Sequence, residues 1–332
     1  MAQVAERAQV SRATVSRVLA GTAEVAEATR LRVLDAVETL GYVPSAGAQE
    51  LAAGKSRTVG LLIRSPANPA YGELFSKIQE WTDAYGLELV TVAPTYYRGA
   101  ADELSALRRL VSMRVGAILV STGVIRTEEL KQFLPVLPIV TVGRPESDPE
   151  VYGISYDEAN HATQVARAVY GCGHRKVAVV SPPTENSLAE HLRGVRTAEV
   201  LRDLGCEVFA VDANAFGTSK DGAGAVIDLV QHQSVTAAVF SNDLRSVEFL
   251  TQARKIGIEA PRDLSVVGLD GLLPGLELMG LASLTLPVDV VARRAVEVIS
   301  QMLNDRESVQ VRHELYSGEL HPGASLGVVP RM

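Results

Sequence analysis

Short apolar runs that alternate with helix-patterned stretches most constrain the fold of this 332-residue chain. The runs are four to seven residues long, and amphipathic stretches such as ELFSKIQEWTDAYG and SVEFLTQARKIG lie between them. Continuous apolar strands separated by helices are typical of parallel sheets covered on both faces, so the expected fold class is α/β. The runs are Val59 to Ile63, Leu87 to Ala93, Ala117 to Val120, Ile139 to Val142, Val177 to Val180, Glu207 to Val211, Ala237 to Phe240 and Leu264 to Leu269.

The runs fall into two similar halves, one from Val59 to about Asp157 and one from Lys176 to Asp270. Each half is a βαβ series of about 100 residues, an ordinary domain size. A helix over Val288 to Leu303 and a strand within VQVRHELYSGEL are expected to close one half and cross to the other. We therefore predict two subdomains, residues 58–156 with about 284–312 and residues 157–283 with about 313–332.

Polar residues follow the ends of the predicted strands, where open parallel sheets bind ligands. Two facing sheets would place these residues around a common cleft. The candidates are Ser65, Asn68, Tyr71, Ser121, Arg144, Asp157, Ser181, Asn242, Asp243 and Asp270.

Residues 1–44 differ from the rest because they consist of short amphipathic helical segments almost without β-branched runs. Three helices are expected, the third over Ala28 to Leu40 with Gly41 ending it, and the first two form a helix-turn-helix. The apolar residues expected to pack together are Val4, Ala5, Ala8, Val15, Val18, Leu19, Val33, Val37 and Leu40.

The second of these helices carries its polar side chains away from the apolar face. Ser11 is placed as its N-cap, with Thr14 in the first turn. The pairs Arg12/Ser16 and Ala13/Arg17 occupy the outer face, where a recognition helix makes its base and phosphate contacts.

Composition and motifs exclude several other classes of protein. A net charge of −7 excludes nucleic-acid binding through a bulk positive field. Cys172 and Cys206 lie far apart, which argues against a disulfide framework or a zinc site, and no apolar stretch reaches the ~18 residues of a membrane span. The six histidines lack metal-ligand spacing, and no phosphate-binding, nucleophile-elbow or dinucleotide motif occurs. We therefore expect a soluble, cytoplasmic protein without a catalytic, metal or cofactor site.

The segments VAERAQVSRATVSRVLAG and VAEATRLRVLDAVETLGYVPSAGAQELAAGKSRTVGLL resemble the headpiece and hinge of the LacI/GalR family of bacterial transcription regulators. The resemblance continues through ANPAYGEL, GCGHRKVAVV, FSNDL and DLSVVGLDG, so it covers essentially the whole chain. It implies a DNA-binding head over residues 1–44, a hinge helix and linker over 45–57, and a body like a periplasmic sugar-binding protein. The last implication agrees with the two-sheet prediction.

The resemblance also implies roles in DNA binding. Leu51, in hinge segment 45–52, matches the leucine that enters the minor groove and kinks the duplex. Two hinge helices meet only in a dimer, so a homodimer or tetramer on a palindromic operator in double-stranded DNA is expected. The predicted DNA-binding residues are Ser11, Arg12, Ala13, Thr14, Ser16, Arg17 and Leu51.

Strand ends and the resemblance together predict where a small-molecule effector binds. Carboxylates that accept bonds from hydroxyls, next to an aromatic ring, suit a sugar-like ligand. Alternatively, Asp243 and Asp270 simply cap the helices that follow their strands. The predicted effector-binding residues are Asn68, Tyr71, Arg144, Asp157, His191, Asn242, Asp243 and Asp270.

Several of these body positions depart from the family pattern. His191 stands three residues before Gly194, where sugar-binding relatives place an arginine, and imidazole cannot supply the guanidinium fork. His191 is therefore either a ligand contact or a surface residue. Glu158 and His161 alter the D-N-x-x-G turn, and Gly271 removes the second acid of a D-D pair. An ordinary hexose or pentose is accordingly a weaker expectation here than for a typical relative.

The head and hinge depart as well. Met1 falls within the first helix of the family, so a capping and phosphate-binding Thr is missing, and Gln9 replaces a frequent turn glycine. In the hinge, Gly47 weakens helix propensity and Glu50 places a negative charge near DNA. These differences predict weak, salt-sensitive operator binding.

The sequence thus predicts a dimeric, sequence-specific DNA-binding regulator, expected to be a repressor, whose affinity a small ligand controls. One alternative is a cytoplasmic small-ligand-binding module with a vestigial head. A second is an enzyme on the same fold.

Overall fold

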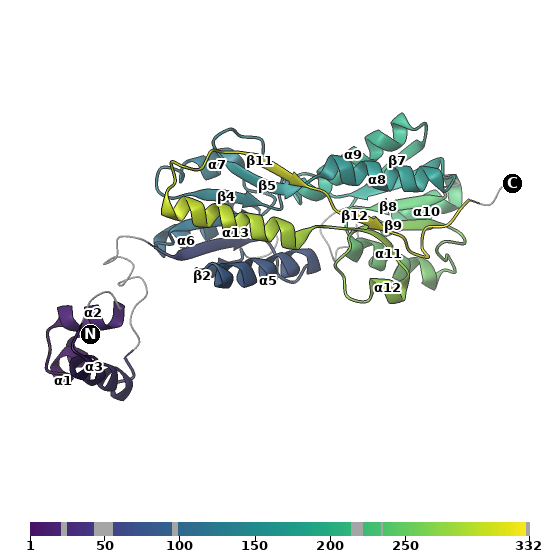
Figure 1. Cartoon of the computed structure of the whole chain (residues 1–332). Coiled ribbons are helices and arrows are strands. Elements are labelled where there is room, and N and C mark those ends of the chain that lie inside the picture. Colours follow the sequence, from purple (N-terminus) through teal and green to yellow (C-terminus); the bar gives the residue numbers. More distant parts are fainter. Residues whose placement is uncertain (21–24, 43–55, 95–98, 214–221, 234, 330–332) are drawn as a thin grey trace. The chain divides into compact units, whose positions relative to one another are not determined.

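The computed structural model describes residues 1–20, 25–42, 56–94, 99–213, 222–233 and 235–329, in two units, Met1–Arg57 and Thr58–Met332 (Figure 1). The predicted hinge segment, with Gly47, Glu50 and Leu51, lies outside the described residues. No helix in the described ranges is long and apolar enough to cross a membrane.

The first unit contains α1 (Ala2–Arg7), α2 (Arg12–Ala20) and α3 (Glu27–Thr39). Their apolar faces form one small core, as the spacing predicts, with Val18, Leu19 and Val37 partly buried at its edge. Leu40 was expected in this core but is 40% exposed, because α3 ends one residue before it. The fully buried residues are Val4, Ala5, Ala8, Val15, Val33 and Ala36.

The turns that end α1 and α3 have the same geometry with different residues. Val10 N–H bonds the Ala5 carbonyl at 2.9 Å, and Tyr42 N–H bonds the Val37 carbonyl at 3.0 Å, the pattern of a Schellman turn. The left-handed residue is Gly41 after α3, with φ 55°, but Gln9 after α1, with φ 53°. Gln9, which replaces a frequent turn glycine, therefore adopts a left-handed conformation that is strained for a residue with a side chain.

The second unit contains two six-stranded sheets (Figure 1). The first has the order β11-β5-β4-β3-β1-β2, and its strands are all parallel. Its strands are β1 (Thr58–Ile63), β2 (Glu88–Val92), β3 (Ala117–Ser121), β4 (Ile139–Val142), β5 (Tyr152–Tyr156) and β11 (His313–Tyr316), with helices α5 (Pro69–Ala84), α6 (Ala100–Ser112), α7 (Thr127–Lys131) and α13 (Val288–Asn304).

The second sheet has the order β12-β10-β9-β8-β6-β7, with only β12 antiparallel to its neighbour. Its strands are β6 (Lys176–Ser181), β7 (Glu207–Asp212), β8 (Ala237–Phe240), β9 (Ser265–Asp270), β10 (Ala282–Thr285) and β12 (Glu319–His321), with helices α8 (Glu158–Gly171), α9 (Leu188–Asp203), α10 (Ala223–Gln233), α11 (Asp243–Lys255) and α12 (Leu276–Met279).

All eight apolar runs form strands, with boundaries within one residue of those predicted. The α/β class and the two-sheet body are confirmed. The predicted crossover at about residue 313 is wrong, because β11 pairs with β5 in the first sheet and the chain crosses between Tyr316 and Glu319. Gly318 lies at this crossing, where a Cβ atom would come within 1.9 Å of the Thr285 carbonyl oxygen.

Candidate functional site

The outer face of α2 is the candidate DNA-reading surface of the head. Ser11 caps the helix, since its Oγ accepts the Thr14 N–H at 3.1 Å and lies 2.9 Å from the Thr14 hydroxyl. Arg12, Ala13 and Arg17 are exposed, and Arg17 Nε donates to the Ala13 carbonyl at 3.3 Å. Ser16 is half-buried. The helix therefore presents two guanidinium groups to solvent.

A second candidate site is a cavity between the two sheets of the body, lined by both polar and apolar side chains. Its volume is about 40 Å³, roughly the space of one water molecule and far below the 300–1,000 Å³ of ordinary ligand pockets. A sugar-sized molecule can therefore enter only if the subdomains separate. The first subdomain contributes Asn68, Ala70, Tyr71, Leu74, Gly143 and Tyr156, and the second contributes Ser187, Ala189, Glu190, Arg193, Asp270 and Leu286.

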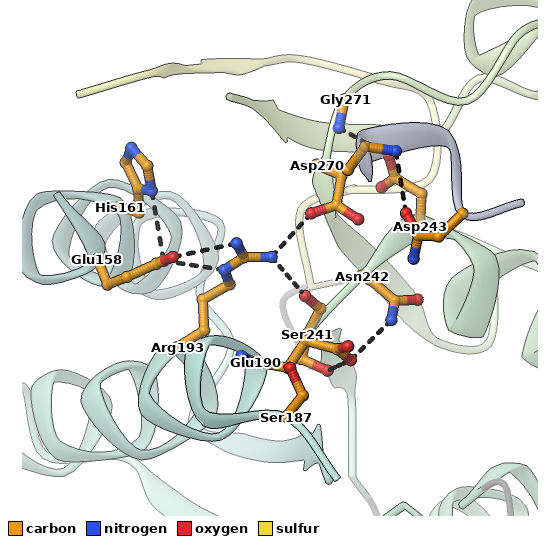
Figure 2. A network of polar contacts seen from close by, with 12 residues as sticks. Glu158, His161, Ser187, Glu190, Arg193, Ser241, Asn242, Asp243, Asp270 and Gly271 are labelled. Carbon is orange, nitrogen blue, oxygen red and sulfur yellow. Dashed lines mark hydrogen bonds and ion pairs between the residues drawn. The ribbon is translucent and has the colours of Figure 1, made fainter. Parts of the chain in front are cut away.

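Arg193, on α9, is the centre of a buried network (Figure 2). Its Nε and Nη2 donate to the two carboxylate oxygens of Glu158 at 2.9 and 3.0 Å, a bidentate pair. Its Nη1 donates to Asp270 Oδ1 at 2.8 Å and to the Ser241 carbonyl at 3.0 Å. Burial alone would lower the pKa of Arg193, but Glu158 and Asp270 outweigh it and raise that pKa, so the side chain stays charged.

Glu158 also contacts His161 one turn later on α8. His161 Nε2 accepts the Gly318 N–H at 2.8 Å, so a neutral ring carries its proton on Nδ1, which lies 3.5 Å from Glu158 Oε2. Burial tends to raise the pKa of Glu158, but Arg193 and His161 lower it more, and Glu158 is held ionised.

Glu190, one turn before Arg193, collects a second set of donors (Figure 2). Its Oε2 accepts from the Ser241 hydroxyl at 3.1 Å, the Asn242 amide at 2.7 Å and Arg245 Nε at 3.3 Å. Burial favours a higher pKa for Glu190, but Arg245 and two other arginines lower it. The carboxylate is therefore anionic within the wall of the cavity.

Asp270, at the end of β9, is the third carboxylate of the wall. It adopts φ 112°, a strained conformation for a residue with a side chain. Burial, with Asp243 and Glu190 nearby, raises the pKa of Asp270 to about 8 despite Arg193. Burial also raises the pKa of Asp243 to about 6, although Ser283 Oγ and the Gly271 N–H donate to its carboxylate at 2.6 and 2.7 Å. The cavity thus holds a carboxyl group that can take up a proton near neutral pH.

Comparisons with known proteins identify both units. Residues 1–45 match the model for bacterial regulatory proteins of the lacI family, and residues 166–326 match that for a periplasmic binding protein-like domain. Catabolite control protein A of Priestia megaterium is 28% identical over 326 residues, covering 94% of this chain and 96% of that protein. The chain belongs to the LacI family. Its members are transcription regulators rather than enzymes.

Other LacI-family proteins are similar to this chain over nearly its full length. The repressor PurR of Aliivibrio salmonicida is 27% identical over 328 residues, covering 96% of this chain and 95% of that protein. The lac repressor dimer bound to operator and the anti-inducer ONPF superposes with a TM-score of 0.83 at 20% identity, covering 98% of both chains. A complex of the regulator CelR with cellobiose superposes with a TM-score of 0.69 at 25% identity, covering 97% of this chain and 98% of that one.

The predicted effector residues are only partly brought together in this LacI-family body. Asn68, Tyr71 and Asp270 line the cavity, while Asn242 and Asp243 lie directly behind its wall. The remaining three lie elsewhere. Arg144 lines a different cavity, Asp157 accepts the Asn160 N–H as the N-cap of α8, and the His191 ring bonds the Pro182 carbonyl at 3.0 Å.

The capping alternative for the two aspartates is not what the structure shows. Asn242, rather than Asp243, is the N-cap of α11, accepting the Arg245 N–H at 2.9 Å. Asp243 instead accepts hydrogen bonds from the Gly271 N–H, after β9, and from the Ser283 hydroxyl, on β10, and so links the two strands. No helix begins at Asp270, whose carboxylate bonds Arg193.

Sequence reasoning missed the side chains that hold the network together, Arg193 and Glu190, and treated Glu158 and His161 only as departures from the family. Glu190, Arg193 and Thr197 recur at the spacing of one helical face. Charged residues on a face whose spacing is typical of buried apolar residues could have indicated a buried ion network. Among the described residues, no cluster of three or more His, Cys, Asp or Glu side chains could hold a metal ion.

The loss of the second acid at Gly271 has a steric reason. Gly271 has φ 66°, and a Cβ atom there would lie 2.4 Å from Thr285 Cα and 2.1 Å from its Oγ1. Strand β10 packs too closely against the end of β9 for any side chain at residue 271. The D-D pair of other family members therefore cannot form here.

Proposed function

We propose that this LacI-family DNA-binding regulator is a repressor that acts in the cytoplasm as a homodimer on a palindromic operator. A small polar effector in the cavity between its subdomains sets its affinity for DNA. The observation that supports this control most directly is that both subdomains supply side chains to one cavity too small for a sugar. A ligand there must change how the subdomains close, and it shifts DNA affinity to the extent that it prefers one closure state.

The donor and acceptor balance of the wall favours a ligand rich in hydroxyl donors. Arg193 already uses four of its five N–H groups on Glu158, Asp270 and Ser241. The hydrogen bonds that Glu190 accepts within the described residues use Oε2, so we propose its Oε1 as the acceptor for a ligand hydroxyl. The rings of Tyr71 and Tyr156 supply an aromatic wall.

Two relatives support a sugar-like effector. CelR binds cellobiose, and a periplasmic binding protein/LacI regulator from Alkaliphilus metalliredigens was solved with D-xylulofuranose. In this protein Arg193 and Asp270 line the cavity, and Arg193 is paired with both Glu158 and Asp270. We expect a neutral polyol or glycoside and not an anionic ligand in this cavity.

For DNA binding, we propose that Arg12 and Arg17 grip the operator, with Ala13 against a base edge and Ser16 near a phosphate. Ser11 and Thr14 act first as the cap of α2, which leaves them a secondary role. Leu51 remains the proposed minor-groove lever. The lac repressor dimer bound to operator supports the dimeric arrangement.

The test is a linkage measurement on the full chain. Fluorescence anisotropy of a labelled duplex from the upstream region of its own gene is recorded with and without cellobiose, glucose, ribose and adenosine. We expect one of these neutral ligands to change the Kd for DNA about tenfold, a coupling typical of allosteric proteins. Asp270→Asn should remove this response while leaving DNA affinity without ligand intact.

The alternative, a ligand-binding module with a vestigial head, has two supporting observations: α1 lacks a side-chain cap, and Gln9 is strained. It predicts saturable ligand binding with no salt-dependent complex on any duplex. That combination would contradict the proposed repressor, whereas a sugar response of DNA affinity contradicts the alternative.

A further inference from the structure

We propose that His161 is a pH-sensitive latch on the segment that joins β11 to β12: its neutral ring holds the Gly318 amide, and its protonated ring releases it. The ring is fully buried on α8, next to Glu158 (Figure 2). Both residues depart from the D-N-x-x-G turn of the family, so a typical member lacks this pair. The inference concerns the body alone and does not depend on the proposed effector or operator.

The segment held by His161 is one of three that connect the two sheets of the body. The chain crosses at Asp157 between β5 and α8, after Thr285 between β10 and α13, and between Tyr316 and Glu319. Asp157 N–H donates to the Tyr316 carbonyl at 2.9 Å, which joins the first crossing to the third. The third also lies against the second, since a Cβ atom on Gly318 would overlap the Thr285 carbonyl oxygen. A change at Gly318 therefore acts where the two halves of the body are connected.

The hydrogen bond between His161 and Gly318 requires a ring nitrogen without a proton. Gly318 N–H is the donor and His161 Nε2 is the acceptor, 2.8 Å apart. A neutral imidazole has one such nitrogen, whereas an imidazolium has two N–H donors and no acceptor. Protonation of Nε2 would place two N–H groups against each other in a fully buried site. Acid conditions therefore favour an arrangement in which the Gly318 amide has moved away from the ring.

The charges around the ring act on it in opposite directions. Glu158 Oε2 lies 3.5 Å from His161 Nδ1, and its negative charge attracts an imidazolium. Arg193, on α9, repels an imidazolium, but its guanidinium is bonded to Glu158 and Asp270. A counter-charge for the protonated ring is thus already in place. Further titratable groups on the neighbouring elements are Asp157, which accepts from the Asn160 N–H and the Ser317 hydroxyl, Tyr156 on β5, which burial keeps neutral by raising its pKa, and the exposed Glu319 and His321 on β12.

Gln164, about one turn after His161, holds the same segment through bonds that do not titrate. Its Nε2 donates to the Gly318 carbonyl at 2.9 Å, and its Oε1 accepts the Leu320 N–H at 3.1 Å. Protonation of His161 therefore frees the Gly318 N–H without detaching β12. The Leu320 amide is a reference for the Gly318 amide within the same segment.

The experiment is hydrogen–deuterium exchange of the full chain at single-amide resolution, from about pH 8 to about pH 5.5, which spans the ordinary histidine pKa near 6.5. Each rate is divided by the intrinsic rate of an unstructured amide at the same pH, which gives a protection factor. We expect the ratio of the Gly318 to the Leu320 protection factor to fall at least about tenfold with acid, the change that one linked proton produces per pH unit. Taking the ratio cancels losses of protection caused by global unfolding.

Three variants test the roles of the ring and its counter-charge. In His161→Gln the amide oxygen can accept the Gly318 N–H and does not titrate, so the ratio should not depend on pH. His232→Gln, at an exposed position on α10, should keep the parental profile. Glu158→Gln removes the negative charge beside Nδ1, so the fall of the ratio should move to lower pH.

Three results would each overturn the proposal. The first is a ratio in the parent that does not change with pH, and the second is a fall in His161→Gln equal to that of the parent. The third is an unchanged midpoint in Glu158→Gln. The parent and Glu158→Gln decide the question even if His161→Gln does not fold.

Discussion

Asp270 combines a backbone conformation rare outside glycine with burial beside a second acid and an arginine. Such strain persists only where the surroundings hold it, and it is common at binding sites. Family resemblance located this residue correctly in the cavity wall. Its raised pKa depends on Asp243 and Glu190, which the fold brings together from separate elements, and so could not be read from the local sequence.

Stability should therefore depend on the protonation of Asp270. An unfolded Asp has a pKa near 3.9, whereas the folded pKa is about 8, so the folded state holds the extra proton between these values. This contribution to stability is complete below about pH 4 and is lost as pH rises to 8. The slope reaches about 1.4 kcal/mol per pH unit for one proton.

Urea unfolding between pH 7.5 and 9 tests this, because histidines of ordinary pKa, near 6.5, are largely neutral there. The parent should lose stability up to about pH 8 and then level off. Asp270→Asn should flatten the profile, and the exposed Asp203→Asn should retain the parental slope. Parallel profiles for the parent and Asp270→Asn would contradict the assigned pKa.

Arg193 should be costly to remove on its own. Arg193→Ala leaves Glu158 buried with its ion-pair partner gone, and breaking a buried pair this way typically costs about 3–5 kcal/mol. Adding Glu158→Gln should recover part of the loss, because the stranded charge is gone. Urea unfolding gives the stability of the parent, of Arg193→Ala and of the double variant, with Arg202→Ala as the exposed control. A cost for Arg193→Ala no larger than that of the control would refute the network.

The difference between His191 and Arg193 shows what sequence matching could not provide. Two residues on a helix point about 200° apart, so the family position of the usual arginine faces the Pro182 carbonyl while Arg193 faces the sheet. The family pattern names a position. It does not show which side chain of α9 is buried in this protein, where the neighbouring residues differ from the family pattern.

Turn geometry governs the helix ends of the head. Gln9 and Gly41 occupy equivalent left-handed positions, where a side chain costs about 1 kcal/mol. Gln9→Gly should therefore raise the stability of the head by up to about 1 kcal/mol, and Gly41→Gln should lower it by a similar amount. Hydrogen exchange of amides in α1 and α3, measured in the full chain, reports both. Changes of the same sign would rule out this account.

The close approach of β10 to the end of β9 gives a second test. Gly271→Asp, which restores the family's acidic pair, should cost more than about 3 kcal/mol, because it combines a positive φ with atomic overlap at Thr285. Gly224→Ala is the matched control, since no atom of the described residues lies within 4 Å of a Cβ at that position in α10, and it should be neutral or stabilising by about 0.5–1 kcal/mol. Equal effects in urea unfolding would disprove the steric argument.

Strands were predictable where apolar runs were continuous and not where polar or small residues interrupt them. β10, with Ser283 and Thr285, escaped detection for this reason, and β5, with Gly153 and Ser155, was indicated only by the predicted end of the first half near Asp157. Gly153 is required by packing, since a Cβ there would lie 2.7 Å from Glu146 Cβ. Such constraints come from neighbours distant in sequence.

The whole molecule combines a head with little net positive charge and an acidic body. A helical head followed by a two-sheet body was predictable, because local turns and family motifs specify both parts. The crossover after β11 and the pairing of buried charges were not, because they depend on contacts between elements far apart in the chain. With so few cations on the head, operator affinity must rely on dimerisation and specific contacts.

The most direct test is anisotropy of a labelled duplex from the gene's own upstream region, titrated with the full chain at several salt concentrations. We predict saturable binding that weakens steeply with salt, prefers this duplex to a shuffled one, and falls at least about tenfold in Arg17→Ala. Arg254→Ala, an exposed arginine of the body, should bind like the parent. Equal binding of the native and shuffled duplexes, with Arg17→Ala indistinguishable from the parent, would contradict sequence-specific regulation by this protein.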